Sequence, residues 1–177
     1  ALIFKFWFHL SREQMEMRLK SLADDPSHSW RFSPLDWKQG KTYGRVVKHG
    51  EHIIRRSSRD YAPWYVVESS DRHYRNLTVG KIILQGLRAA LEQARGPRPA
   101  PHAVPVSANF GTRRLLESLD LGKSLDKDEY KAQLAHEQAR LSSLLHDKRM
   151  RRHALVAVFE GNDAAGKGGA IRRVTEA

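Results

Sequence analysis

The sequence predicts an α/β fold in which a parallel β-sheet is flanked by helices. Three observations support this prediction. Apolar runs at residues 2–8, 62–68 and 154–160 are typical of buried strands. Amphipathic helical patterns separate these runs. A glycine-rich loop joins the last run to a further helical pattern, which is the context that a phosphate-binding loop requires.

The first part of the chain predicts a strand followed by a helix. After the strand at residues 2–8, the pattern S-x-x-Q at residues 11–14 is a capping box, which starts a helix. The sequence Asp-Asp-Pro at residues 24–26 ends this helix. Apolar side chains spaced at i, i+4 and i+7 form its buried face: Met15, Leu19 and Leu22.

A second helix is expected from Ser33 and Pro34, because serine is a preferred N-cap and proline suits the first helical position. Gly40, Gly44 and Gly50 weaken this prediction, since each costs a helix about 1 kcal/mol relative to alanine. The apolar face of this helix comprises Tyr43, Val46, Val47, Ile53 and Ile54.

The strand at residues 62–68 is followed by a helix expected at residues 71–94. Four prolines between residues 96 and 105 cannot continue that helix, and they predict a stiff linker at a domain boundary. The predicted organisation is a first part at residues 1–95, a linker at 96–106 and a second part at 107–177. One side of the helix is lined by Leu77, Ile83, Leu84, Leu87 and Leu91.

Beyond the linker, four leucines at positions 115, 116, 119 and 121 suggest a short packed segment. Acidic residues at 126–129 then occupy the first turn of a long helix. Basic residues at 148–152 fit an ordinary helix C-terminus or, alternatively, a nucleic-acid patch. The apolar stripe of the long helix contains Tyr130, Leu134, Leu141 and Leu145.

The segment at residues 161–169 fits the frame G-x-x-x-x-G-K of a phosphate-binding loop. Its glycines let backbone N–H groups converge, Lys167 adds a positive charge, and the following helix presents its N-terminus to the same anion. The alternative is a glycine-rich turn that contains a lysine by chance. The candidate phosphate-binding residues are Gly161, Asn162, Ala164, Ala165, Gly166, Lys167, Gly168 and Gly169.

Gly168 stands where such loops usually carry a serine or threonine whose hydroxyl holds Mg²⁺. Another oxygen must then hold the metal, and Asp163 inside the loop is the candidate. The alternative is that Asp163 only shapes the turn.

Lys and Arg number 31 and Asp and Glu number 20, so the net charge is +11, which favours polyanionic partners. The absence of cysteine excludes disulfides and thiolate metal sites. No apolar run reaches the roughly 20 residues of a membrane span, and the first ten residues lack the features of a signal peptide, so we expect a cytoplasmic protein. Because the chain starts without methionine and stops just after the loop, we expect it to be part of a longer polypeptide.

Residues 160–171 resemble the phosphate loop of the polyphosphate kinase type 2 family, in which an aspartate inside the loop and a glycine after the lysine are usual. Residues 121–140 resemble the helix that leads into that domain. The first half is similar to the other end of the same family at 5–14, 25–26, 30–34 and 62–67. The chain therefore resembles the end of one kinase domain followed by the start of a second, as in the two-domain members.

This resemblance implies a P-loop kinase-like fold with a helical lid, present here as parts of two tandem domains. It implies transfer of a phosphoryl group from inorganic polyphosphate to AMP, giving ADP, with Mg²⁺. Lys167 and the loop would hold phosphate, and Asp163 would serve the metal or the acceptor phosphate. The basic lid positions correspond to Arg12, Arg18 and Arg31, whereas His28 stands where the family often has lysine.

Two other functions are compatible with the sequence: an ATP-dependent nucleotide kinase, and a non-catalytic basic module that binds RNA or polyphosphate. We expect a homo-oligomer without a membrane or a specific nucleic acid as partner. Because neither part contains a whole kinase domain, we also expect residues 1–177 alone to be inactive. The sequence leaves open which repeat of the longer protein is active.

Overall fold

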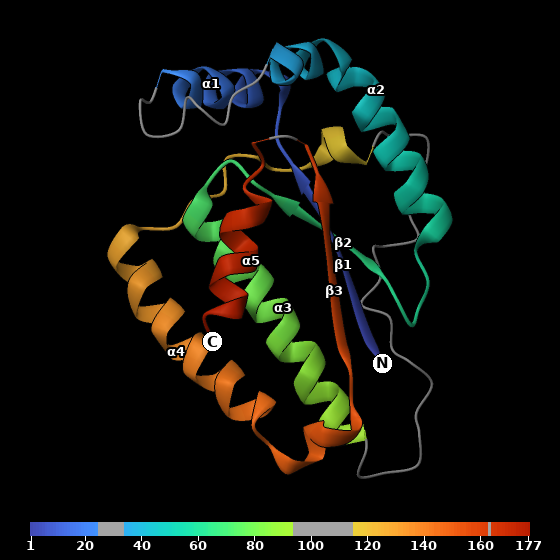
Figure 1. Ribbon diagram of the computed structural model, residues 1–177, viewed down its shortest axis with the longest axis vertical. Coiled ribbons are helices and arrows are strands. Elements are labelled where there is room, and N and C mark those ends of the chain that lie inside the picture. Colours follow the sequence, from blue (N-terminus) through green and yellow to red (C-terminus); the bar gives the residue numbers. More distant parts are fainter. Residues whose placement is uncertain (25–33, 94–114, 163) are drawn as a thin grey trace.

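The computed structural model describes residues 1–24, 34–93, 115–162 and 164–177. Three parallel strands form one sheet in the order β2-β1-β3, and helices lie on both sides of it (Figure 1). The central strand is β1 (Leu2–His9), and the outer strands are β2 (Trp64–Glu68) and β3 (Leu155–Gly161). The predicted α/β fold with a parallel sheet is therefore confirmed.

The strand register brings the two parts of the chain together. Along β2, the pairing runs from Lys5 opposite Trp64 to His9 opposite Glu68. Along β3, it runs from Leu2 opposite Leu155 to Phe8 opposite Gly161. The carboxyl ends of all three strands consequently meet at one edge of the sheet, which is where α/β proteins place their ligands. The predicted linker at 96–106 lies outside the described residues, and the division into domains stays a prediction.

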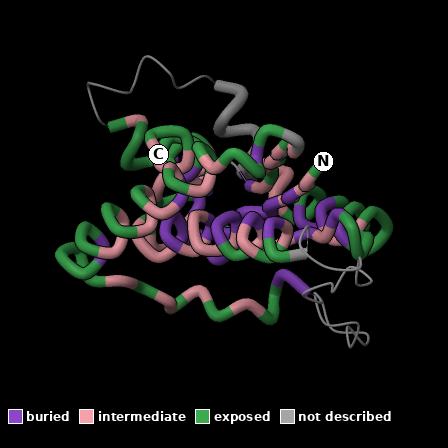
Figure 2. Tube along the Cα trace, turned by 90° about the horizontal axis from the view of Figure 1, so that it is seen from below, coloured by how far each residue is buried: buried purple, intermediate pink, exposed green. Residues whose placement is uncertain are grey.

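Three helices lie on one side of the sheet: α3 (Arg72–Gln93) and α5 (Lys167–Thr175) pack against the strands, and α4 (Lys127–Leu145) packs against α3 (Figure 1). Successive residues of a strand point to opposite faces, so Phe4, Phe6 and Phe8 of β1 share this side. They form the main core with buried residues of the three helices. All five leucine and isoleucine positions predicted for α3 are buried. Figure 2 shows the buried positions gathered in the interior of the fold.

The opposite face is covered by α2 (Pro34–Ser57) and by the 3₁₀ turn η2 (Leu116–Ser118). Trp7 points to this side and packs so closely on α2 that a Cβ at Gly50 would lie 2.3 Å from the indole ring. The glycine that weakens the helix on propensity therefore allows the tryptophan to pack. Of the apolar face expected for α2, Val47 and Ile54 are buried, whereas Val46 and Ile53 are exposed.

The helix α1 (Arg12–Ala23) lies beyond the carboxyl ends of the strands (Figure 1). Its capping box is confirmed: the Gln14 N–H donates to Ser11 Oγ at 3.1 Å, and the Ser11 N–H donates to Gln14 Oε1 at 3.2 Å. Met15 and Leu19 are buried as expected, but Leu22 is exposed, because the helix ends one residue later.

Two further expectations are wrong. The strand β3 is not buried on both faces, since Val156 and Val158 are 47% and 37% exposed. β3 is an edge strand, and within the described part of the chain these side chains point away from the helices that cover its other face. The basic residues after α4 form a separate 3₁₀ turn, η3 (Lys148–Arg152), rather than the last turn of α4.

The long helix α4 begins as predicted, with the Asp126 side chain accepting from the N–H groups of Asp128 and Glu129. Of its expected stripe, Tyr130 and Leu141 are buried, Leu134 is half-buried and Leu145 is exposed. None of the helices in the described part of the chain combines the length and apolar character that crossing a bilayer requires.

Candidate phosphate-binding site

The glycine-rich loop begins against the end of the central strand. Gly161 has φ +136°, and a Cβ there would lie 2.1 Å from the carbonyl oxygen of Phe8. The N–H of the next residue, Asn162, donates to that same oxygen at 3.1 Å. Only glycine allows this close approach, and it fixes the start of the loop at the carboxyl edge of the sheet.

The loop then turns tightly into α5. Ala164 and Gly166 have φ values of +57° and +85°, both in the left-handed region. The Ala165 N–H donates to the carbonyl of Asn162 at 3.2 Å, which closes the turn. Gly166 is the N-cap, and the N–H of Ala170 donates to its carbonyl at 3.2 Å. The three preceding amides, at positions 167–169, belong to the first helical turn, where N–H groups are available to an anion.

The Lys167 side chain folds back onto the loop that precedes it. Its Nζ donates to the carbonyl oxygens of Gly161 at 2.9 Å and Asn162 at 3.0 Å. The ammonium group therefore lies against the first two residues of the loop. A phosphate at the helix N-terminus would lie within reach of the same charge.

Arg18 brings a second positive charge from α1 to the loop. Its Nη1 donates to the carbonyl of Ala164 at 3.0 Å, and its Nη2 donates to the carbonyls of Ser69, at 2.8 Å, and Ser70. Burial lowers the pKa of the guanidinium from its usual value, and Asp71 partly offsets this shift. One of the three predicted lid arginines is thus placed at the loop, 146 residues away in the sequence.

Arg75, which no sequence motif singles out, brings a third positive charge. It lies in the first turns of α3, is 5% exposed, and donates through Nη1 to the carbonyl of Ala165 at 3.0 Å. Its Nε and Nη2 both donate to Asn76 Oδ1, at 3.1 and 3.0 Å. Its position in the topology was the available signal. Because α3 follows β2, the first turns of α3 lie at the sheet edge that carries the loop.

The other predicted site residues have different surroundings. Arg12 of α1 lies over the ring of Tyr43, 5.4 Å from its centroid, and so connects α1 to α2. Arg31 and Asp163 lie outside the described residues. Asn162 is 2% exposed, and neither its Nδ2 nor its Oδ1 has a hydrogen-bond partner among the residues that the structure describes.

His9 is a buried titratable group at the same edge of the sheet. Its side chain is 3% exposed, and its Nδ1 has no partner within the described ranges. Burial lowers the pKa of His9 to about 4, and the charge of Glu117 acts in the opposite direction. The imidazole is therefore neutral at physiological pH.

No group of three or more His, Asp or Glu side chains that could hold a metal ion occurs in the described part of the chain. Apart from Asn162 Oδ1, the loop oxygens located there are backbone carbonyls, and several already accept from Lys167, Arg18 or Arg75. The expectation of a magnesium site at Asp163 is not tested, because that residue is outside the described ranges.

Comparisons with known proteins agree on one family. The family model described as polyphosphate kinase 2 matches residues 1–95 and 124–177. The polyphosphate:AMP phosphotransferases of Pseudomonas aeruginosa and Pseudomonas syringae pv. tomato are 64% and 60% identical over the whole chain, which spans 36% of each relative. A crystal structure attributed to polyphosphate kinase 2 from Pseudomonas aeruginosa PA01 is 54% identical over 99% of this chain and 30% of its own, with a TM-score of 0.38.

Proposed function

Because the chain belongs to the polyphosphate kinase 2 family, we propose that the full-length protein transfers a phosphoryl group from inorganic polyphosphate to AMP, giving ADP. The relatives that match the whole chain carry the name of this activity. The observation that carries the proposal is a strand–loop–helix unit at the carboxyl edge of a parallel sheet, with three cationic side chains bound to the loop.

In this proposal the loop binds the phosphoryl donor. The amides of the first turn of α5 and the positive end of the helix dipole face the phosphate chain, and Lys167 exchanges the carbonyls of Gly161 and Asn162 for phosphate oxygens. The net charge of +11 favours the approach of a long polyanion over that of a neutral substrate.

Phosphoryl transfer needs positioning and charge stabilisation more than covalent participation of the protein. Lys167 supplies charge from within the loop, and Arg18 supplies it from α1. Asp163, together with phosphate oxygens, would hold Mg²⁺, since the ion prefers hard oxygen ligands. Magnesium bound there would neutralise part of the charge of the phosphate chain. Arg12 and Arg31 remain candidates for lid contacts with the donor, and the cytoplasmic location and homo-oligomeric state remain predictions.

The test is a comparison of phosphoryl donors with the purified full-length protein. AMP is incubated with long-chain polyphosphate or with ATP, and ADP formation is followed in the presence and absence of Mg²⁺. We expect ADP from polyphosphate, and a large loss of that activity in Lys167→Ala. Activity with ATP alone would indicate an ATP-dependent nucleotide kinase instead. Binding of polyphosphate by the wild-type protein without formation of ADP from either donor would indicate the non-catalytic module.

A further inference from the structure

A buried arginine lies directly beneath the candidate phosphate loop. The Arg75 guanidinium donates to the carbonyl of Ala165 and fills the space beside Gly166, where a Cβ would lie 1.8 Å from its Nη1. It also lies close to Gly169, whose Cβ would be 3.2 Å from Nη2. The guanidinium is therefore packed against Gly166 and Gly169, whereas a Cβ at Gly168 would meet nothing within 4 Å.

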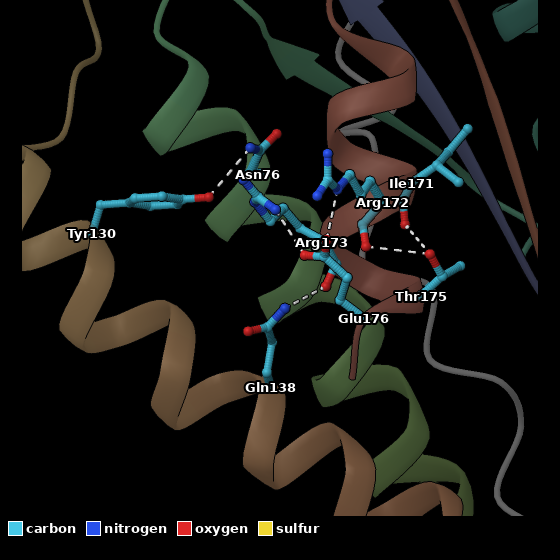
Figure 3. Close-up of polar contacts among 8 residues, drawn as sticks. All are labelled: Asn76, Tyr130, Gln138, Ile171, Arg172, Arg173, Thr175 and Glu176. Carbon is cyan, nitrogen blue, oxygen red and sulfur yellow. Dashed lines mark hydrogen bonds and ion pairs between the residues drawn. The ribbon is translucent and has the colours of Figure 1, made fainter.

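Arg75 is itself held by a chain of hydrogen bonds that ends on another helix. Asn76 accepts two hydrogen bonds from Arg75. It also donates through Nδ2 to the hydroxyl of Tyr130 on α4 at 3.3 Å, which Figure 3 shows. The same helix reaches α5, because Gln138 Nε2 donates to the carbonyl of Arg173 at 2.9 Å (Figure 3). The helix α4 thus contacts both α3, which carries Arg75, and α5, which the loop precedes.

The hydrogen bonds of Arg75 that the structure describes hold its positive charge with neutral acceptors rather than with a carboxylate. Each hydrogen bond that it donates within the described residues ends on a neutral oxygen, from Ala165 or Asn76. Burial and the nearby charges of Arg18 and, to a smaller extent, Arg72 lower its pKa to about 10, whereas Tyr130 and Asp71 raise it. The group therefore remains protonated at neutral pH. A buried cation held by neutral groups is stabilised further when an anion comes close.

We propose that Arg75 is a positioning residue that holds the phosphate loop in its binding shape, and that the bound polyphosphate balances its buried charge. This inference rests on the proposed function for the identity of the anion. Its structural part is independent of the transfer reaction, because it concerns the shape of the loop before any chemistry occurs. Arg75 acts through the backbone of Ala165 and Gly166 and does not itself contact substrate.

The test uses four variants of the full-length protein and two measurements. Arg75→Met removes the charge and its hydrogen bonds, Arg75→Lys keeps the charge alone, and Tyr130→Phe removes the hydroxyl that supports Asn76. Arg88→Met is the matched control, since Arg88 lies on the same helix more than three turns beyond Arg75. The first measurement is the polyphosphate concentration that gives half of the maximal rise in unfolding temperature. The second is the KM for polyphosphate and for AMP.

We expect Arg75→Met to raise the polyphosphate midpoint and KM by about tenfold or more, because a charge-assisted contact to the loop is lost. The KM for AMP should stay within about twofold, which a general loss of structure would not produce. Arg75→Lys should recover part of the loss, and Tyr130→Phe should raise the midpoint by about threefold, since it removes one neutral hydrogen bond. Arg88→Met should match the wild type.

A folded Arg75→Met protein with the midpoint of Arg88→Met would overturn the inference. If Arg75→Met does not fold, unchanged midpoints in both Arg75→Lys and Tyr130→Phe would overturn it equally. A wild-type protein that polyphosphate does not stabilise would overturn the charge-balancing role. A wild-type protein that binds polyphosphate but forms no ADP would contradict the proposed function alone, and the order of the binding midpoints would still decide the role of Arg75.

Discussion

Replacing Gly166 by alanine should destabilise the loop through two separate effects. The residue has φ +85°, and the left-handed region costs a residue with a Cβ about 1–2 kcal/mol. The new Cβ would also lie 1.8 Å from Arg75 Nη1, so the guanidinium must move away from Ala165. Losing a hydrogen bond from a charged group costs about 1.5–3 kcal/mol.

Together these effects amount to about 2.5–5 kcal/mol in the free energy of unfolding. For a chain of 177 residues, each kcal/mol shifts the unfolding temperature by about 2–4 °C, so we expect a fall of about 5–20 °C. Thermal unfolding followed by circular dichroism measures this shift. The neighbouring glycines provide graded controls, because a Cβ at Gly169 would meet Arg75 Nη2 at 3.2 Å, whereas one at Gly168 would meet nothing within 4 Å.

The expected order of unfolding temperatures is therefore Gly168→Ala highest, Gly169→Ala intermediate and Gly166→Ala lowest. Gly168→Ala should be neutral or stabilising by up to about 1 kcal/mol, because the residue lies inside α5 and alanine favours helix. In an Arg75→Met background, Gly166→Ala should retain only the backbone cost of about 1–2 kcal/mol. An equal cost of Gly166→Ala in both backgrounds would refute the reasoning, since the guanidinium would then not occupy that space.

Three further predictions concern stability elsewhere in the fold. Burial lowers the pKa of His9 to about 4, so the unfolded chain binds the proton more readily than the folded protein. The free energy of unfolding should therefore fall by about 3 kcal/mol between pH 7 and pH 4. In His9→Gln, the free energy of unfolding measured in urea should depend less on pH over this window. Gly50→Ala should lower the urea midpoint because its Cβ would overlap the Trp7 ring. Gly44→Ala should not, since the nearest atom to its Cβ would be Arg12 Nη2 at 4.0 Å. Ser11→Ala should cost about 1 kcal/mol through loss of the N-cap, and a change below 0.3 kcal/mol in thermal unfolding would contradict this.

The sequence predicted the elements well where the signal is local. The capping box at Ser11, the N-cap at Asp126 and the strand–loop–helix order around Lys167 depend on residues within one or two turns of each other. The exposure of Val156 and the separate turn after α4 could not be read in this way. Both depend on which surfaces other elements cover, and an apolar β-branched run does not reveal whether its strand is central or at an edge.

The same distinction explains which parts of the candidate site could be predicted. The loop is contiguous, so its glycines and Lys167 can be recognised as a pattern. The contacts of Arg18 and Arg75 with the loop join residues 146 and 90 positions apart. They arise because β1 pairs in parallel with both of its neighbours, which brings the start of α1, the start of α3 and the loop to one edge of the sheet. An arginine in the first turns of a helix that follows a parallel strand is therefore a candidate for this edge before any contact is known, and Arg75, which belongs to no recognisable motif, could be selected only by that topological reasoning.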